Sequence, residues 1–545
     1  MTGALEELNE VEAFDLEALA FDERREPEGG PRRVAIRVSG LRKSYGALEA
    51  VKGVDLEIEA GEIFGLIGPD GAGKTSVFQI LGGVMRQTAG EAEMYGVGAR
   101  DARPFVGYLT QTFSLYQDMT VLENLHYIGE LRRLSRADIN ERGMHYLRMF
   151  DMARFTDRLA GSLSGGMKQK LALACALISE PRILLLDEPT TGVDPVSRRE
   201  FWDTLVHLSG QGMTVVVATP YLDEAERCTR VALMFDGRIH QTGTPAEIRR
   251  GLGLERLEVR ASDLGRAEDV LASTQGIDDV QRFGDRLDLM VEDPARGEEL
   301  TRAALTSAGL ETLGVRHTSP TLENAFVSIL RASVGSAATP AFPRRRRFRE
   351  RPEGAVAIGA RSLHKRFGSF HAVKDVNIEV KYGEIYGLLG ANGAGKTTTI
   401  KILCGLLAPT SGEMELAGEH GSLRSSFVRQ RLGYMSQKFS LYDDLTIEEN
   451  LDFFAGVYGV PREERDEKKR WVLAVSGLEG RGHMLTASLP GGWKQRVAFG
   501  AAVMHEPSVL FLDEPTSGVD PLARRAFWKM INSFADRGVA VLVTT

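Results

Sequence analysis

Short apolar runs that end in polar residues are the most regular feature of the chain. Ile183–Leu186 is an unbroken apolar run, and Asp187 and Glu188 follow it directly. Such a run is typical of a strand that is buried on both faces in a parallel sheet. A helical stretch, Met167–Ile178, precedes it. The pattern predicts an α/β fold with two carboxylates at the carboxyl end of a strand, where open sheets of this class bind ligands.

A different pattern occupies residues 246–330, where shorter strands alternate with amphipathic helices. The expected strands are 257–259, 280–283, 287–291 and one near Val315, and the expected helices are 264–273 and 297–307. This β-α-β-β-α-β order favours a small ferredoxin-like α+β domain, which we call the small unit. It carries no catalytic constellation. A closing helix is expected to be capped by Ser319, with Pro320 at its first position.

A glycine-rich loop follows the run Glu62–Ile67 and precedes a helical stretch, 75–81. It has the Walker A pattern of loops that bind nucleotide phosphates. Its glycines let backbone N–H groups curl around phosphates, Lys74 neutralises their oxygens, and Thr75 offers a hydroxyl to Mg²⁺. With the serine that follows, the loop consists of Gly68, Pro69, Asp70, Gly71, Ala72, Gly73, Lys74, Thr75 and Ser76. We therefore expect the phosphates of a nucleotide to bind here.

Two further segments suit phosphate chemistry. Asp187 is placed to hold Mg²⁺, and Glu188 to accept a hydrogen bond from an attacking water. The small residues 164–166 open the helix 167–178, and the unpaired N–H groups at a helix start attract an anion. The segment from residue 162 to residue 194 thus combines three parts of one site.

The order of an LSGG turn, an apolar strand ending in Asp-Glu, and a TGVD turn resembles the ATP-binding cassette (ABC) ATPases. The resemblance implies that Tyr45 stacks on adenine, packing of this ring on the core being the alternative. It implies that Gln111 reaches the Mg²⁺ and the attacking water from a helical subdomain, 120–159. The other nucleotide contacts that it implies are Ser164, Gly165, Gly166 and Gln169.

The whole design repeats after a linker. Lys396 lies 322 residues after Lys74, and Asp513 lies 326 residues after Asp187, which indicates a duplication with one net four-residue insertion. We call residues 34–245 the first cassette and residues 356–545 the second cassette. By correspondence, the second cassette's expected site residues are Phe367 on adenine; Gly390, Ala391, Asn392, Gly393, Ala394, Gly395, Lys396, Thr397 and Thr398 in the loop; Thr397, Gln437 and Asp513 on Mg²⁺; Glu514 on the water; and Gly491 and Gly492 at the helix start.

Two prolines depart from the family's pattern. Pro220 stands where the family has a switch histidine, and Pro490 replaces the serine of the second signature turn. Neither proline side chain can donate a hydrogen bond. In the family, each ATP lies between the Walker motifs of one cassette and the signature helix of the other. Both losses therefore fall in site one, which contains Lys74, and site two, which contains Lys396, is expected to turn over.

The remaining segments form a tail, a linker and an end. Residues 1–33 carry ten acidic and four basic side chains, a net of −6, and form an acidic flexible tail. Residues 331–355 form a linker with the Arg-rich run 344–349, which is either solvated or in contact with an anionic membrane surface. The sequence ends at Thr545, one residue before the second switch position, so we expect a truncated cassette whose next residue is histidine.

Composition adds exclusions. Most of the net charge of −8 belongs to the tail, so the nearly neutral body lacks the basic footprint of a nucleic-acid-binding protein. The three cysteines have no metal-ligand spacing, so neither a disulfide nor a zinc site is indicated. No apolar run approaches the ~20 residues that span a bilayer.

The predicted fold is therefore α/β, with two P-loop ABC-type nucleotide-binding domains, each with a helical subdomain, and the small unit. The ending of the small unit resembles drug-exporter ATPases of the daunorubicin-resistance type. The resemblance implies an ATPase on the cytoplasmic face of the membrane, driving separately encoded permease subunits that contact the exported substrate. Phe113, Leu115 and Tyr116 are candidates for a groove that receives a partner helix, plain core packing being the alternative. A soluble tandem-cassette protein acting on ribosomes is the alternative function.

Overall fold

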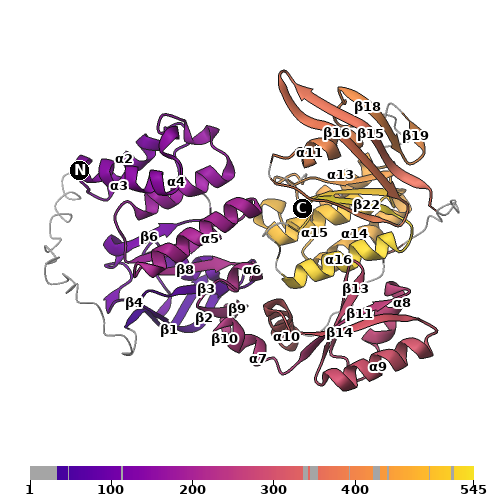
Figure 1. Ribbon diagram of the computed structural model, residues 1–545, viewed down its shortest axis with the longest axis horizontal. Helices are drawn as coiled ribbons and strands as arrows, with labels where there is room; N and C mark the ends of the chain where they lie inside the picture. The colour runs from indigo at the N-terminus through magenta and orange to yellow at the C-terminus, as the bar shows by residue number, and fades with distance from the viewer. Residues whose placement is uncertain are drawn as a thin grey trace.

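A computed structural model describes residues 33–46, 48–111, 114–334, 342–343, 354–391, 393–420, 430–437, 441–489, 491–516, 519 and 521–544. In Figure 1 the first cassette lies on the left, the second cassette on the upper right, and the small unit below the second cassette. Several predictions lie outside the described residues: those for nearly all of the acidic tail, most of the linker with its Arg run, Phe113, Asn392, Pro490 and Thr545.

A six-stranded sheet forms the centre of the first cassette. The apolar run predicted as a strand is confirmed, since all five of its residues, Ile183–Asp187, are buried in a strand with parallel neighbours on both sides. The sheet order is β10-β9-β3-β8-β7-β6, parallel except for the β9–β10 pair. Its strands are β3 (Ile63–Ile67), β6 (Val106–Leu109), β7 (Ile183–Asp187), β8 (Thr214–Thr219), β9 (Arg230–Phe235) and β10 (Arg238–Gly243).

Helices cover this sheet and form an arm beside it. Ser164 and Asp194 cap two of them. Asp194 accepts from the backbone N–H groups of the two residues that follow Pro195, which explains why a helix begins at this turn. The arm, at the upper left of Figure 1, contains α2 and α3. The helices are α1 (Lys74–Leu81), α2 (Val121–Leu131), α3 (Arg136–Met149), α4 (Gly165–Leu177), α5 (Pro195–Gly210), α6 (Leu222–Ala225) and α7 (Pro245–Arg250).

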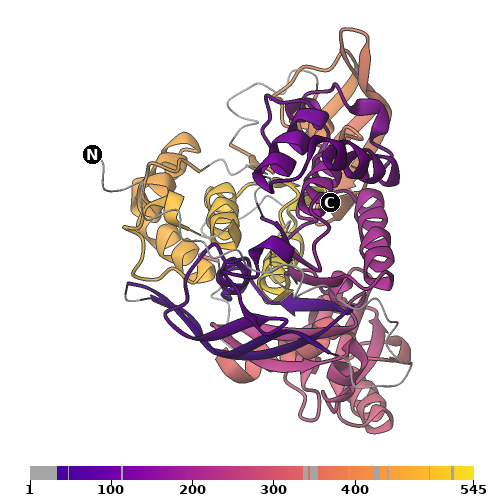
Figure 2. The same ribbon diagram turned by 90° about the vertical axis from the view of Figure 1, so that its left-hand side faces the viewer.

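An antiparallel sheet completes the first cassette. Its order is β2-β1-β4-β5, and its long strands lie across the lower part of Figure 2. Its apolar side chains share a core with Phe64 of β3 and with Phe78 of α1, so the glycine loop between these two elements is held by packing on both sides. The strands are β1 (Val34–Tyr45), β2 (Leu48–Glu59), β4 (Ala89–Met94) and β5 (Val97–Gly98).

The second cassette repeats both layers. Its parallel sheet has the order β17-β22-β21-β20, which matches β3-β8-β7-β6, and its antiparallel sheet has the order β16-β15-β18-β19. The predicted duplication is therefore confirmed at the level of strand order. The strands are β15 (Val356–Phe367), β16 (Phe370–Lys381), β17 (Ile385–Leu388), β18 (Ser411–Leu416), β19 (Glu419–His420), β20 (Leu432–Met435), β21 (Val509–Asp513) and β22 (Ala540–Thr544), and the helices are α11 (Lys396–Leu403), α13 (Ile447–Val457), α14 (Arg462–Ser476), α15 (Gly491–Val503) and α16 (Pro521–Ala535).

The small unit has the predicted β-α-β-β-α-β element order. Its antiparallel sheet runs β12-β13-β11-β14, and its helices pack on one face over a core that includes Leu257, Leu271 and Leu305. The elements are β11 (Glu255–Ala261), α8 (Leu264–Ala272), β12 (Asp279–Phe283), β13 (Arg286–Val291), α9 (Pro294–Ser307) and β14 (Thr312–Thr318).

The helix that closes the small unit packs elsewhere. α10 (Leu322–Val334) places Leu322, Phe326 and Leu330 in the hydrophobic core of the first cassette. The predicted helix start is wrong by two residues. Thr321 is the cap, because its hydroxyl accepts from the N–H of Asn324 at 3.2 Å.

Candidate nucleotide sites

The glycine loop of the first cassette is shaped around its lysine. Gly73 has φ 102°, and a Cβ there would lie 2.5 Å from the carbonyl oxygen of Ala50, so only glycine fits. The Nζ of Lys74 donates to the carbonyl oxygens of Gly68 and Pro69 at 2.8 and 3.0 Å. α1 begins at Lys74, so the unpaired N–H groups of the helix start lie close to the ammonium group of Lys74. Together they form a site that can bind a phosphate.

Asp187 ends β7 as a buried carboxylate, and neither of its oxygens has a hydrogen-bond partner of standard geometry among the described residues. Burial raises the pKa of Asp187 to about 6, and Thr75 and Lys74 oppose this shift by favouring the ionised form. A buried carboxylate with so few polar contacts is unusual in a folded protein. Beside a threonine hydroxyl it fits a small oxygen-loving cation such as Mg²⁺.

Glu188 contacts two other predicted site residues, Gln111 and Lys74. Its Oε2 accepts from Nε2 of Gln111 at 2.9 Å, and its Oε1 lies 3.5 Å from Nζ of Lys74. Its backbone φ is 49°, in the left-handed region that glutamate rarely adopts. The turn after β7 therefore directs this carboxylate toward the glycine loop and the Gln111 segment.

The second cassette builds the same arrangement with more hydrogen bonds. Lys396 donates to the carbonyl oxygens of its own loop, and Gln437 Nε2 donates to Oε2 of Glu514 at 2.8 Å. Oδ1 of Asp513 accepts from the hydroxyl of Thr397 at 3.2 Å, while its Oδ2 is buried and has no partner in the part of the chain that the structure describes. The free oxygen again fits a cation.

Thr544 is a site residue that sequence reasoning missed. Its hydroxyl donates to Oδ1 of Asp513 at 2.7 Å and accepts from the backbone N–H of Glu514 at 3.0 Å. In the first cassette, strand pairing places Ala218 at the equivalent position. The sequence did contain a signal for this role: Thr544 is a hydroxyl residue in the strand that pairs with the end of the Asp513 strand.

The adenine candidates are exposed rather than packed in a core. Tyr45 is 44% exposed at the end of β1, and its hydroxyl lies 3.2 Å from that of Ser76. Phe367 is 50% exposed at the matching end of β15. An exposed ring beside the phosphate loop suits stacking on a base.

The signature residues occupy helix starts. Ser164 accepts from the N–H of Met167 at 3.4 Å, and Gly491 begins α15. Gln169, expected on the resemblance to contact nucleotide, is buried, and its Nε2 donates to the carbonyl oxygen of Pro189. It therefore ties α4 to the segment that follows Glu188.

The two cassettes meet at the first loop. A Cβ added to Gly491 would lie 3.9 Å from Oδ2 of Asp70, so the start of α15 in the second cassette lies against the glycine loop of the first. Pro220, directly after β8, is buried and offers no donor to this site.

A small cavity lies beside the Gln111 segment. Its volume is about 160 Å³, and its lining includes Leu115, Leu131, Arg132 and Cys175. Leu131 and Tyr116 are exposed nearby. Leu441, the counterpart of Leu115 in the second cassette, is buried in the core of that cassette. Leu115, one of the predicted groove residues, is partly buried and packs against the core of the first cassette. Core packing, the alternative interpretation, therefore holds for Leu441 and in part for Leu115, and the groove itself stays a prediction.

The cysteines are buried, and burial raises the pKa of the Cys175, Cys228 and Cys404 thiols. Within the described ranges, no helix combines the length and the apolar character that crossing a membrane requires.

Comparisons with known proteins agree with the geometry. A family model described as ABC transporter matches residues 51–191 and 373–517. The chain is 42% identical over 530 residues to "Probable multidrug ABC transporter ATP-binding protein YbhF" of Escherichia coli (strain K12), covering 94% of this chain and 89% of that protein. It is 36% identical over 303 residues to "Daunorubicin resistance ATP-binding protein DrrA3" of Streptomyces coeruleorubidus, covering 54% of this chain and 95% of that protein. A solved "Structure of ATP binding subunit of ABC transporter" is similar at 29% identity and a TM-score of 0.38, covering 40% of this chain and 93% of that one.

Proposed function

The chain belongs to the ABC transporter family, as an ATPase with two cassettes, and from this premise we propose that it is the motor subunit of an export-type transporter. The names of its relatives, which include multidrug and daunorubicin resistance, support a drug or another small molecule as the cargo. Separately encoded permease subunits would bind that cargo, and the chain would act on them from the cytoplasmic face of the membrane.

ATP with Mg²⁺ is the cofactor that we propose at both sites. One observation carries this assignment: each cassette places a lysine, held by its own glycine loop, beside a buried carboxylate with at least one oxygen that no described residue contacts in standard geometry. Lys74 and Lys396 would meet the phosphates, while Asp187 and Asp513 would hold the ion. When bound, Mg²⁺ neutralises charge that develops on the phosphate oxygens.

The glutamates supply the base. In each cassette, a glutamine amide fixes one oxygen of the carboxylate of Glu188 or Glu514. The other oxygen of Glu514 would accept a hydrogen bond from the attacking water, and the glutamine amide would fix the direction of that bond. In Glu188 the corresponding oxygen lies 3.5 Å from Nζ of Lys74.

The two sites are proposed to be unequal. The approach of Gly491 to Asp70 supports a composite site one, built from the first cassette's loop and the second cassette's helix start. Site one then combines Pro220 and Pro490, whereas site two uses the intact start of α4. We propose that site one holds MgATP and that site two turns it over, with Glu514 as the principal base.

Docking to a permease can be tested at the exposed edge of the cavity. Leu131→Glu places a charge on this surface without emptying a core, because Leu131 is 63% exposed. The variant should detach the chain from membranes that contain its permease, with ATP binding unchanged. Leu313→Glu is the matched control, since Leu313 is 61% exposed on the small unit. If Leu131→Glu stays on the membrane as the control does, this surface is not the docking site.

A tandem-cassette protein that acts on ribosomes remains the competing function. The relatives named above are transporter components, which favours export. Purification of the tagged native chain separates the two functions. Recovery of membrane proteins with it supports the motor, and sedimentation with ribosomes would overturn it.

A further inference from the structure

Helix α16 of the second cassette has two distinct faces. Phe527, Ile531 and Phe534 are buried in the core of their own cassette. At 3.6 residues per turn, positions 529 and 536 lie within roughly 40° of Arg525 around the axis, on the opposite face. This polar stripe faces the small unit.

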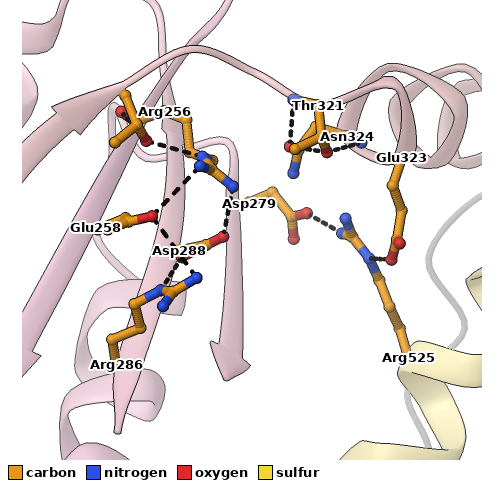
Figure 3. Close-up of polar contacts among 10 residues, drawn as sticks. Arg256, Glu258, Asp279, Arg286, Asp288, Thr321, Glu323, Asn324 and Arg525 are labelled. Atoms are coloured by element: carbon orange, nitrogen blue, oxygen red, sulfur yellow. Dashed lines mark hydrogen bonds and ion pairs between the residues drawn. The ribbon is translucent and has the colours of Figure 1, made fainter. Parts of the chain in front are cut away.

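Arg525, at one end of the stripe, makes its most buried contact. Its Nη1 lies 2.7 Å from Oδ2 of Asp279, and its Nε lies 3.3 Å from Oε1 of Glu323 (Figure 3). The Arg525 side chain is only 8% exposed, and those of Asp279 and Glu323 are 15% and 24% exposed. Such a pair is largely removed from water, so loss of one partner is far more costly than at an open surface.

The stripe makes a second contact at the far end of α16. Nη1 of Arg282 lies 3.1 Å from both carboxylate oxygens of Asp536. Between the two ends, Lys529 acts on Glu268 of α8: burial raises the pKa of Glu268, and Lys529 and Arg282 oppose this by favouring the ionised form. Opposite charges therefore face each other along the length of the helix.

The two acidic partners of Arg525 belong to different parts of the molecule. Asp279 begins β12 of the small unit. Glu323 lies on α10, whose apolar side chains are part of the first cassette's core. One guanidinium thus joins the second cassette to both the small unit and the first cassette.

The surface that receives α16 is built in advance. On the polar face of the small sheet, Asp288 is buried and pairs with Arg256 and Arg286 at 3.1 and 3.2 Å (Figure 3). Arg256 also donates to the hydroxyl of Thr318 at 2.8 Å. These bonds fix the sheet edge beside Asp279, so little ordering is needed when α16 docks.

The first cassette offers a natural comparison. Arg199 on α5 is the counterpart of Arg525, at the same 326-residue offset that separates Asp187 from Asp513. Arg199 is exposed. The buried contact is therefore a property of the second cassette's helix among the described residues.

We propose that the small unit and α10 form a docking surface for α16, and that Arg525 is a positioning residue for the second ATP site. α16 begins at Pro521, seven residues after Glu514, so a shift of the helix moves the segment that carries this carboxylate. The positioning role rests on turnover at site two, as proposed above. The docking surface does not depend on it.

The test compares Arg525→Glu with Arg199→Glu in the full chain. Hydrogen exchange of β12 amides reports docking, and steady-state kinetics report turnover of ATP. Arg525→Glu should raise exchange in β12 about tenfold and lower kcat about tenfold with KM for ATP unchanged, as expected when buried charges in contact are uncoupled. Arg199→Glu should change neither. Adding Asp279→Arg and Glu323→Arg to Arg525→Glu should restore both readouts in part, which a merely unfolded variant would not do.

Each outcome has one meaning. Unchanged exchange in Arg525→Glu would overturn the docking surface. Faster exchange with unchanged kcat would keep the surface and overturn the positioning role. If the wild-type chain hydrolyses no ATP, the proposed function fails, while the exchange data still decide on docking.

Discussion

The two cassettes share a fold and differ in how it holds the same carboxylate. Asp513 is bound by the hydroxyls of Thr397 and Thr544, whereas Asp187 has no partner of standard geometry among the described residues. The difference between Ala218 and Thr544 is small enough to leave the strand pairing identical. Packing has therefore preserved the duplicated fold while the polar groups of the sites have diverged.

A second difference lies in the helical arms. Lys468 is buried between Glu464 and Glu506 at 2.8 and 3.0 Å, with only 2% of its side chain exposed. The counterpart pair Arg142–Glu180 is closed at 3.0 Å, but its side chains are 29% and 57% exposed. The same pairing thus lies inside one cassette and at the surface of the other.

The largest effect is expected at the catalytic glutamates. Glu514→Gln should lower ATP turnover by roughly 10²-fold to 10⁴-fold, because it removes the base at the site expected to turn over. Glu188→Gln should cost less than about tenfold. Steady-state hydrolysis by the two variants in the full complex is the measurement. Equal losses would mean that the sites are equivalent or tightly coupled, and the comparison of the cassettes would have to be abandoned.

The next largest effect is expected on the free energy of unfolding, which should fall by different amounts in the two cassettes when the cation of each arm pair is removed. Lys468→Ala leaves two buried carboxylates without a cation and should cost about 3 to 5 kcal/mol. Arg142→Ala breaks a solvated pair and should cost about 1 kcal/mol or less. Urea unfolding can be measured by hydrogen exchange of the amides in β7 for the first cassette and in β21 for the second, so that the stability of each cassette is obtained individually. Similar costs for the two variants would show that burial does not distinguish the pairs.

The smallest of the three effects is expected at Thr544. Thr544→Val removes the hydroxyl at nearly constant volume and should lower turnover about tenfold, the usual magnitude for a hydrogen bond to a charged group. Thr544→Ser should keep most of the activity. Mg²⁺ affinity, measured by titration with a fluorescent nucleotide, should follow the same order. A fully active Thr544→Val would mean that the hydroxyl is incidental to the site.

The motifs could be predicted because their chemistry leaves a local pattern. A loop that needs left-handed glycines such as Gly73, followed by a lysine at a helix start, is visible in adjacent letters, and so is an apolar run that ends in Asp187. Nothing local marks Arg525, whose partners Asp279 and Glu323 are 246 and 202 residues away. The burial of Leu441 likewise could not be predicted from the local sequence, because it depends on how the helical arm of the second cassette packs on the rest of that cassette.

The left-handed backbone of the two glutamates has a consequence for protein engineering. Glu188 and Glu514 hold φ values of 49° and 50°, which costs an L residue roughly 1 to 2 kcal/mol. Glycine or asparagine would adopt this conformation with less strain. A selection for thermal tolerance alone would therefore favour replacement of these two side chains and yield robust proteins that no longer hydrolyse ATP. Laboratory evolution of this ATPase requires that turnover be screened together with melting temperature.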